Sequence, residues 1–452
     1  MLDKPNIILI NCDDLGYGDL GCYGSKVNRT PTIDRMAQKG LRFSDFYMAS
    51  PVCSPSRGAM MTGCYPPRIG FGKFDGSCVL FPGDGIGLDQ KEISMAKLLK
   101  DVGYETMLVG KWHCGDQKEF LPTTHGFDHY YGLPYSNDMG RQAGNRKLMP
   151  PLPLMRDAEV IQEQPDQASL TERYTEQSVR FIRDNKDKHF FLYLAHMHVH
   201  LPLYAPENFM KNSMNGPYGA CVEAVDWSTG VILDELEKAG IEENTLVIFT
   251  SDNGSNCRNN GSNSPLRGTK ATTWEGGQRV PCIMYWPGKI SEGGKCKGIV
   301  SSIDFYPTIA RLAGVKVPQD RIIDGMDITD ILFDDKPSPR KTFFYYWKND
   351  LEAVRSENWK LHVKKGDESI CELYELDKDI GESINVYDKY PEIVTKLKKL
   401  MEDCAKDIGD ESKGIVGKNV RSAGRVDDPK PLTVYDPEHP YIIAMYDKED
   451  AG

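Results

Sequence analysis

Apolar residues alternate between two patterns along the first two thirds of the chain. Nearly continuous apolar runs, typical of strands buried on both faces, occupy residues 5–11, 103–111, 189–196, 245–253 and 280–287. Apolar positions recur at helical spacing in residues 92–103, 170–185 and 221–240. This alternation predicts an α/β fold, in which a mostly parallel sheet is flanked by helices on both faces.

Polar residues follow four of these expected strands. Open α/β sheets collect their reactive groups beyond the carboxyl ends of the strands. The residues at these positions are Asn11, Cys12, Asp13 and Asp14; Lys111 and His113; His196, His198 and His200; and Asp252 and Asn253. The pattern therefore predicts a candidate site at the carboxyl ends of the strands.

The pattern changes near Lys341, where short strands replace the long buried runs and a helical pattern covers 391–407. We therefore expect a large α/β domain over residues 1–340 that carries the site. Residues 341–452 are expected to form a small α+β domain with an antiparallel sheet, a packed helix and an extended tail from Ile408.

Composition and charge limit the classes of partner. The 452 residues are 40% hydrophobic and 27% charged. No apolar run reaches the roughly 18 residues of a membrane span, which predicts a soluble protein. A net charge of -11 argues against nucleic acid and anionic membranes as partners, but it is compatible with a locally positive pocket. The oligomeric state is left open.

The cysteines and the first residues bear on the cellular compartment. Twelve cysteines are scattered without the spacing of a zinc site or a disulfide scaffold, so most are expected to be buried thiols. The chain enters its first expected strand at once, without the regions of a signal peptide. These features favour the cytoplasm. A periplasmic or secreted protein whose leader had been removed would show the same sequence.

Two acidic pairs, Asp13 with Asp14 and Asp252 with Asn253, form a candidate metal site. Brought together at strand ends, these carboxylates would repel one another unless a cation lay between them. Oxygen ligands of this kind suit Ca²⁺ or Mg²⁺. Taken singly, each pair is also typical of a solvated turn or a helix cap.

Cys53 stands at the start of an expected two-turn helix. Ser54 suits the N-cap, Pro55 the first helical position and Gly63 the stop. Arg57 follows one turn later, and a cation near a helix N-terminus is an anion-binding arrangement. A thiol phosphatase needs a longer spacing than the three residues that separate this cysteine from the arginine. A buried cysteine beside a capped helix is the simpler alternative, but it leaves the arginine without a role.

Lysines and histidines complete the candidate site: Lys111, His113, His196, His198, His200 and Lys270. The first two alternate along an expected strand end, so both point the same way while Trp112 packs opposite. The three later histidines also alternate, and such a run is a candidate binding site for zinc or copper. The neighbouring hard carboxylates disfavour these metals. The last lysine lies in a loop rich in glycine and threonine, where an ordinary solvated lysine is the alternative.

Eight segments resemble, in this order, motifs of the sulfatase family: 13–24, 30–47, 53–63, 110–115, 125–138, 198–202, 250–254 and 268–281. The third contains the signature Cys-x-Pro-Ser-Arg followed by Thr-Gly. Eight ordered motifs over roughly 270 residues are far more specific than one. The sequence is most similar to the arylsulfatase A and N-acetylgalactosamine-6-sulfatase group. The resemblance implies an alkaline-phosphatase-like α/β domain with a small C-terminal domain.

In this family a maturation enzyme oxidises the motif cysteine to formylglycine, whose aldehyde hydrates to a gem-diol. The resemblance implies that one diol oxygen binds a metal and attacks the sulfur of a sulfate ester. Ca²⁺ is favoured over Mg²⁺. The implied metal ligands are Asp13, Asp14, Cys53, Asp252 and Asn253.

The resemblance also implies a set of catalytic residues: Cys53, Arg57, Lys111, His113, His200 and Lys270. The arginine and the first lysine would hold the diol and the metal environment, while Ser136, His200 and Lys270 would bind sulfate oxygens. His200, which directly precedes Leu-Pro, would protonate the leaving alkoxide, and His113 would take the proton of the second diol hydroxyl.

The implied activity is hydrolysis of a sulfate ester on a sugar. Two alternatives are a phosphonate or phosphodiester hydrolase on the same scaffold and a non-catalytic binder of sulfated glycans, which would result if Cys53 is not converted. Substrate choice is expected to reside in residues 71–90, 137–165 and 255–265. The sugar, the sulfate position and exo or endo action are left open.

Overall fold

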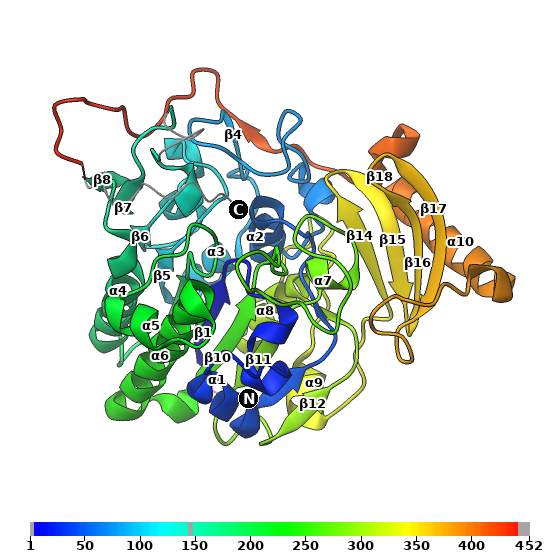
Figure 1. The fold of residues 1–452 in the computed structure, drawn as a ribbon, viewed down its shortest axis with the longest axis horizontal. Helices are drawn as coiled ribbons and strands as arrows, with labels where there is room; N and C mark the ends of the chain where they lie inside the picture. The colour runs from blue at the N-terminus through cyan, green and yellow to red at the C-terminus, as the bar shows by residue number, and fades with distance from the viewer. Residues whose placement is uncertain (1–3, 143–147, 442–452) are drawn as a thin grey trace.

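The computed structural model describes residues 4–142 and 148–441 (Figure 1). Three stretches lie outside the described residues: 1–3 of the expected large domain, 442–452 of the expected small domain, and 143–147 of the segment 137–165.

A ten-stranded sheet forms the centre of the large domain, in the order β12-β2-β11-β10-β1-β9-β5-β6-β7-β8. These strands are β1 (Asn6–Cys12), β2 (Leu41–Phe43), β5 (Glu105–Gly110), β6 (His129–Gly132), β7 (Pro153–Arg156), β8 (Glu159–Glu163), β9 (Phe190–Ala195), β10 (Thr245–Ser251), β11 (Cys282–Tyr285) and β12 (Gly294–Cys296). The five strands from β10 to β6 are parallel. Strands β11 and β2 on one side, and β7 and β8 on the other, join by antiparallel pairing. The expected α/β sheet is confirmed, with its parallel pairing concentrated at the centre.

Strand β1 shows why both faces of the sheet are covered. Ile7 and Leu9 pack into the core on one face, whereas Ile8 and Ile10 pack into the core on the other. Side chains alternate along a strand, so a strand that is apolar at every position requires cover on both sides.

Helices supply this cover on the two faces. The core on one face includes side chains of α1 (Pro31–Lys39), α4 (Leu170–Asp184), α5 (Glu207–Asn212) and α6 (Gly216–Ala239). The core on the other includes α2 (Cys53–Thr62), α3 (Met95–Lys100), α8 (Phe305–Leu312) and α9 (Thr329–Asp334). The three helices expected from the sequence are confirmed. The third begins earlier than predicted because a proline in its first turn suits a helix start.

The C-terminal part is a four-stranded antiparallel sheet covered by a helix. Its strands are β14 (Thr342–Trp347), β15 (Asp350–Ser356), β16 (Trp359–Lys365) and β17 (Glu368–Glu375), and its helix is α10 (Pro391–Ile408). Leu361 of the sheet and Leu397 and Met401 of the helix share one core. The expected antiparallel sheet with a packed helix is confirmed. The division of the chain at residues 340 and 341 stays a prediction.

The chain beyond α10 returns to the large domain (Figure 1). After β18 (Gly409–Asp410) and β19 (Ile415–Val416), strand β20 (Gly424–Arg425) pairs with β4 (Ile86–Gly87). Arg421 forms an ion pair with Glu92 on the way. The last segments of the chain thus pack against residues 86–92 of the large domain. The remaining elements are β3 (Phe46–Tyr47), α7 (Glu275–Gln278) and β13 (Val300–Ser301).

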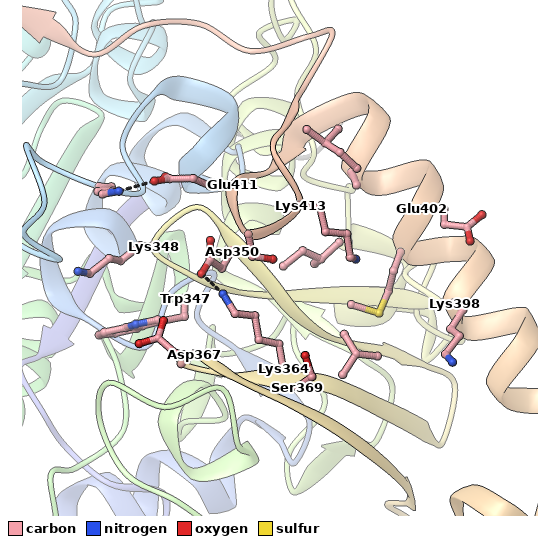
Figure 2. Close-up of a pocket in the computed structure, with 18 of the residues that line it drawn as sticks. Trp347, Lys348, Asp350, Lys364, Asp367, Ser369, Lys398, Glu402, Glu411 and Lys413 are labelled. Atoms are coloured by element: carbon pink, nitrogen blue, oxygen red, sulfur yellow. Dashed lines mark hydrogen bonds and ion pairs between the residues drawn. The ribbon is translucent and has the colours of Figure 1, made fainter.

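A cavity of about 1120 Å³ lies on the C-terminal sheet, beside the end of α10 (Figure 2). Lys364 pairs with Asp350 there, and Lys73 pairs with Glu411. The cavity contains none of the residues that the sequence predicts for the site. Despite its volume, this cavity is therefore not the candidate active site.

No helix within residues 4–142 and 148–441 has the length and apolar character needed to cross a bilayer. All twelve cysteines fall in these ranges as free thiols, and eight of them are buried. The prediction of mostly buried thiols is confirmed.

Gly110→Ala is expected to destabilise the fold strongly. Gly110 ends β5 with a φ of 111°, and an added Cβ would lie 1.8 Å from the carbonyl oxygen of Ala195 on β9. We expect a loss of about 3 kcal/mol or more in the free energy of unfolding, measured by urea denaturation. Gly103→Ala is the matched control. Its φ is 90° but an added Cβ meets nothing within 4 Å, so the loss should be only about 1 kcal/mol. Equal losses would contradict the packing argument.

Candidate active site

A cavity of about 290 Å³ lies at the carboxyl ends of the central strands. Five of the expected site residues line it: Cys53, His113, Ser136, His200 and Lys270. Much of the remaining lining comes from the three segments in which substrate choice is expected, including Val79, Phe81, Asp138, Met139, Asn256 and Arg258. The other expected residues are all buried: Asp13, Asp14, Arg57, Lys111, Asp252 and Asn253.

The register of two neighbouring strands brings the acidic pairs together. Strands β1 and β10 are parallel, with Cys12 opposite Ser251, so Asp13 and Asp252 emerge side by side. Asp14 adopts a φ of 63°. Its Oδ1 accepts a hydrogen bond from Asn253 Nδ2 at 2.7 Å, and its backbone N–H donates to Asp252 Oδ1 at 3.3 Å. Residues separated by about 240 positions thus form one cluster.

Two oxygens in this cluster fit a metal ion. Asp13 Oδ1 and Asn253 Oδ1 are buried, and neither has a hydrogen-bond partner among the described residues. Such atoms are costly unless a ligand satisfies them. Ligand atoms of Asp13, Asp14 and His200 all lie within 4.8 Å of one another. The acidic cluster could therefore hold a metal ion, and its hard oxygens suit Ca²⁺ or Mg²⁺.

The expected ligand set differs from this group in detail. Asp252 lies outside it; Arg57 contacts one of its carboxylate oxygens, and the backbone N–H of Asp14 donates to the other. The Cys53 thiol also lies outside the group, at the cavity wall. The roles of Asp252 and Cys53 as ligands stay predictions.

The buried carboxylates show the effect of like charge. Burial by itself raises the pKa of Asp13, but Lys111 foremost, with His200 and Arg57, outweighs burial and holds this pKa well below its usual range. Burial, and next the charge of Asp13, raises the pKa of Asp252 to about 7. Two adjacent carboxylates whose pKa values are pushed apart in this way need further positive charge before both can ionise.

Three cations are directed at the cluster. Arg57 contacts Asp252 Oδ2 through Nε at 2.9 Å and Nη2 at 2.7 Å. Lys111 Nζ forms an ion pair with Asp13 and donates to Ser136 Oγ at 3.3 Å. Lys270 Nζ lies 3.0 Å from Asp14 Oδ2. Each of the three carboxylates therefore has its own cation. Lys270, for which an ordinary solvated lysine was the alternative, is bound to Asp14 at the cavity.

Helix α2 begins two residues earlier than the sequence predicts. Cys53 is its first residue and Val52 its N-cap, so the predicted N-cap role of Ser54 is wrong. The backbone is still extended at Val52, and Ser54 Oγ instead accepts a hydrogen bond from the backbone N–H of Leu80 at 3.1 Å. Pro55 is consequently the third helical residue. Gly63 ends the helix with a φ of 69°, as predicted.

The thiol of Cys53 is poorly suited to nucleophilic attack as it stands. Burial raises its pKa to about 11, even though Lys111 and Lys270 oppose the shift. The side chain is buried at the start of α2 and lines the cavity. Because the thiolate is the reactive form of cysteine, a protonated thiol in this position is inert at neutral pH.

Hydrogen bonds assign the tautomers of the two cavity histidines. His113 Nε2 lies 3.0 Å from the carbonyl oxygen of Leu80, so it carries the hydrogen and leaves Nδ1 as an acceptor that has no partner within residues 4–142 and 148–441. His200 Nδ1 lies 2.6 Å from the carbonyl oxygen of Leu201 and 3.1 Å from Asn137 Oδ1, so Nδ1 is the donor. Its Nε2 lies 3.9 Å from Asp14 Oδ2. His113 therefore keeps Nδ1 as its acceptor nitrogen, and His200 keeps Nε2, which lies 3.5 Å from Ser136 Oγ.

The extended geometry expected at His113 is wrong, because its φ is 60°. The turn nevertheless leaves His113 at the cavity and Lys111 against Asp13. Trp112 packs into the core as expected, and its Nε1 donates to the carbonyl oxygen of Phe120.

His196 and His198 do not join His200 at the cavity. Burial lowers the pKa of His196 to about 3, so its ring is neutral. The carbonyl oxygen of His198 accepts a hydrogen bond from the backbone of Asp13 at 3.1 Å, which fixes the chain beside the cluster. In the two described ranges, the group of possible metal ligands contains one histidine, not three. The disfavoured zinc or copper alternative therefore gains no support.

Sequence analysis missed Asn137 and the carbonyl group of Leu80. Asn137 holds the Nδ1 side of His200, and its amide is oriented by Gln167 Oε1 and the carbonyl oxygen of Pro202. The position of Asn137 directly after Ser136 was the available signal. A backbone carbonyl such as that of Leu80 leaves no signal in side-chain identity.

An α/β sheet whose strand ends hold buried carboxylates, three cations and two histidines around one cavity is typical of enzymes that hydrolyse anionic esters. The family model "Sulfatase" matches residues 5–315, and "N-sulphoglucosamine sulphohydrolase, C-terminal" matches residues 269–407. The chain belongs to the sulfatase family and is a sulfuric ester hydrolase.

Similarity to individual proteins extends over most of the chain. N-acetylgalactosamine-6-sulfatase of Rattus norvegicus is 40% identical over 377 residues, covering 79% of this chain and 71% of the relative. Arylsulfatase A of Homo sapiens is 36% identical over 445 residues, covering 88% and 87%. The solved structure of Ps i-CgsB in complex with k-i-k-neocarrahexaose shares 33% identity and a TM-score of 0.80, covering 89% of this chain and 93% of that one.

Asp252→Ala is expected to weaken binding of a divalent metal by at least about tenfold, because it removes a carboxylate from the cluster. Elemental analysis and metal titration of the purified protein measure the effect. Lys270→Met is the control, since it removes a cation beside Asp14 and takes away no oxygen. Unchanged metal content in Asp252→Ala would remove Asp252 from the ligand set.

Proposed function

We propose that this sulfatase hydrolyses the sulfate ester of a sugar with an oxygen nucleophile formed from Cys53. The observation that carries the proposal is the position of Cys53. Cys53 opens α2 at the wall of a cavity, beside an acidic cluster and three cations; two oxygens of the cluster have no hydrogen-bond partner in the described part of the chain. The thiol itself is protonated there, whereas an oxygen at the same position would suit its neighbours.

Formylglycine at position 53, made by a maturation enzyme, supplies an oxygen nucleophile through its hydrate, and Ca²⁺ supplies charge that favours ionisation of that oxygen and neutralises the sulfate. Asp13, Asp14, Asp252 and Asn253 would hold the cation. Four oxygen donors and a buried, acidic site favour Ca²⁺, with Mg²⁺ the second choice.

The chain's own residues then bind the ester and move protons. Lys270 and Ser136 line the cavity and are placed to donate to sulfate oxygens, while Arg57 forms an ion pair with Asp252. His113 can accept a proton from residue 53 at Nδ1, because its other nitrogen is committed to Leu80. His200 presents Nε2 to the cavity as the group that protonates the leaving oxygen.

The cavity wall supports a sugar as the carrier of the sulfate. Phe81, Val79 and Met139 offer apolar surface, and Asn256 and Arg258 offer polar groups. Sugars present both kinds of surface, and an aromatic ring suits the apolar one. Ps i-CgsB, a structural relative, was solved with an oligosaccharide bound.

A substrate panel tests the class of ester. Aryl sulfate and sulfated monosaccharides are expected to be hydrolysed at least about a hundredfold faster than an aryl phosphodiester, because the lysines and Ser136 surround a small anionic group. Initial rates at equal substrate concentration measure the ratio. A faster rate with the phosphodiester would favour the phosphonate or phosphodiester alternative.

Cys53→Ala is expected to abolish turnover and to leave binding of a sulfated monosaccharide largely intact, because the cations and the cavity wall remain. Kinetics and calorimetry measure the two properties. Mass spectrometry of the wild-type peptide that contains Cys53 should show formylglycine after expression with a maturation enzyme. Unmodified thiol in an active preparation, or activity in Cys53→Ala, would refute the nucleophile; only unmodified thiol and no activity in protein from a host with a maturation enzyme would favour the non-catalytic glycan binder.

A further inference from the structure

Lys270 lies on a loop, residues 267–277, that is bound at both ends; we call it the Lys270 loop. At the end near the site, the backbone N–H of Lys270 donates to the carbonyl oxygen of Ser255 at 3.0 Å. The backbone N–H of Ala271 donates to Pro51 at 2.9 Å. These bonds connect the loop to the chain just after Asn253 and just before Cys53.

The other end of the Lys270 loop is held by the C-terminal sheet. Lys360 Nζ on β16 donates to the carbonyl oxygen of Thr273 at 2.9 Å and lies 3.0 Å from Glu275 Oε1. Two positions along the same strand, His362 Nε2 lies 2.8 Å from Thr273 Oγ1. Alternate residues of a strand face the same side, so β16 presents both groups to the loop.

These contacts are shielded from solvent. Lys360, Glu275 and His362 are fully buried. A second acid, Glu382, lies 2.8 Å from Lys360 Nζ, and its Oε2 accepts a hydrogen bond from the backbone of Glu275. Removing one partner from a buried ion pair leaves the others uncompensated, so the whole arrangement must shift or solvate. Lys360 is therefore the cation that the two buried glutamates share, and Glu275 has Arg279 Nη1 at 3.2 Å as a second one.

The Lys270 loop is folded tightly enough to transmit such a shift. Within the loop, the backbone N–H of Thr272 donates to the carbonyl oxygen of Thr269 at 3.1 Å, and that of Gly276 donates to the carbonyl oxygen of Arg267 at 2.7 Å. A Cβ at Gly277 would lie 1.9 Å from the carbonyl oxygen of Thr272. The loop consequently has little room to absorb a displacement of Thr273, three residues from Lys270.

We propose that Lys360 is a positioning residue for Lys270, so that the C-terminal sheet completes the sulfate-binding site. The proposal rests on the sulfate-binding role proposed for Lys270. It goes beyond that role by making residues 1–340 an incomplete catalytic unit, because the group that fixes the loop lies on β16.

Lys360→Met in the full-length protein is the direct test, since it keeps the length of the side chain and removes its charge. We expect inorganic sulfate to bind about tenfold more weakly by calorimetry, because Lys270 is displaced. The backbone amides of Lys270 and Ala271 should exchange hydrogen faster, while metal content should not change. KM for an aryl sulfate should rise more than kcat falls.

Lys364→Met is the matched control on the same strand. A register shift separates Lys364 from His362. The side chain of Lys364 lines the cavity of Figure 2, where it pairs with Asp350. Its loss removes an ion pair of strand β16 that takes no part in the contacts between Lys360, His362 and the Lys270 loop. Sulfate affinity and loop exchange should both match the wild type.

Each outcome decides the proposal. A folded Lys360→Met protein with wild-type sulfate affinity and wild-type exchange at Lys270 would overturn it, even if its melting temperature falls. If Lys360→Met does not fold, Thr273→Val removes the hydroxyl that contacts His362 and Glu352 of the C-terminal sheet, with little change of shape, and carries the same expectations. If the wild type binds no sulfate, the proposed function fails, and loop exchange alone decides the coupling: faster exchange supports it and unchanged exchange overturns it.

Discussion

The site depends on the burial of like charges beside one another. Asp13, Asp14 and Asp252 emerge from two adjacent parallel strands, where water cannot screen them. Their mutual repulsion is offset by Arg57 and two lysines, each drawn from a different segment of the chain. Because no one of these pairs would be stable in isolation, the sheet, helix α2 and the Lys270 loop must be in place together.

Sequence reasoning found the residues of this cluster because strand ends can be recognised locally. The buried runs that precede Asp13, Lys111 and Asp252 predicted both the sheet and its reactive edge. The spacing of Cys53 and Arg57 predicted their place on one helix. In each case the signal was carried by side-chain identity within a few residues.

Other features were missed because they are decided by distant parts of the chain. Ser54 has the chemistry of an N-cap, but its hydroxyl oxygen instead accepts a hydrogen bond from the backbone N–H of Leu80. His113 departs from an extended path, and its tautomer is set by a carbonyl group that no motif identifies. Lys360 reads as one more lysine in an antiparallel strand, and only the packing of the C-terminal sheet against the Lys270 loop shows that it meets Glu275. Long-range packing of this kind is invisible to local pattern.

The pairing of β1 with β10 also sets an order of events during synthesis. Asp14 and Asp252 are separated by 238 positions, so the first strand must wait for more than half of the chain before its neighbour exists. Until then Cys53 lies on an open chain, whereas in the finished fold it is 2% exposed. An enzyme that modifies this cysteine would therefore meet it most readily on the nascent chain.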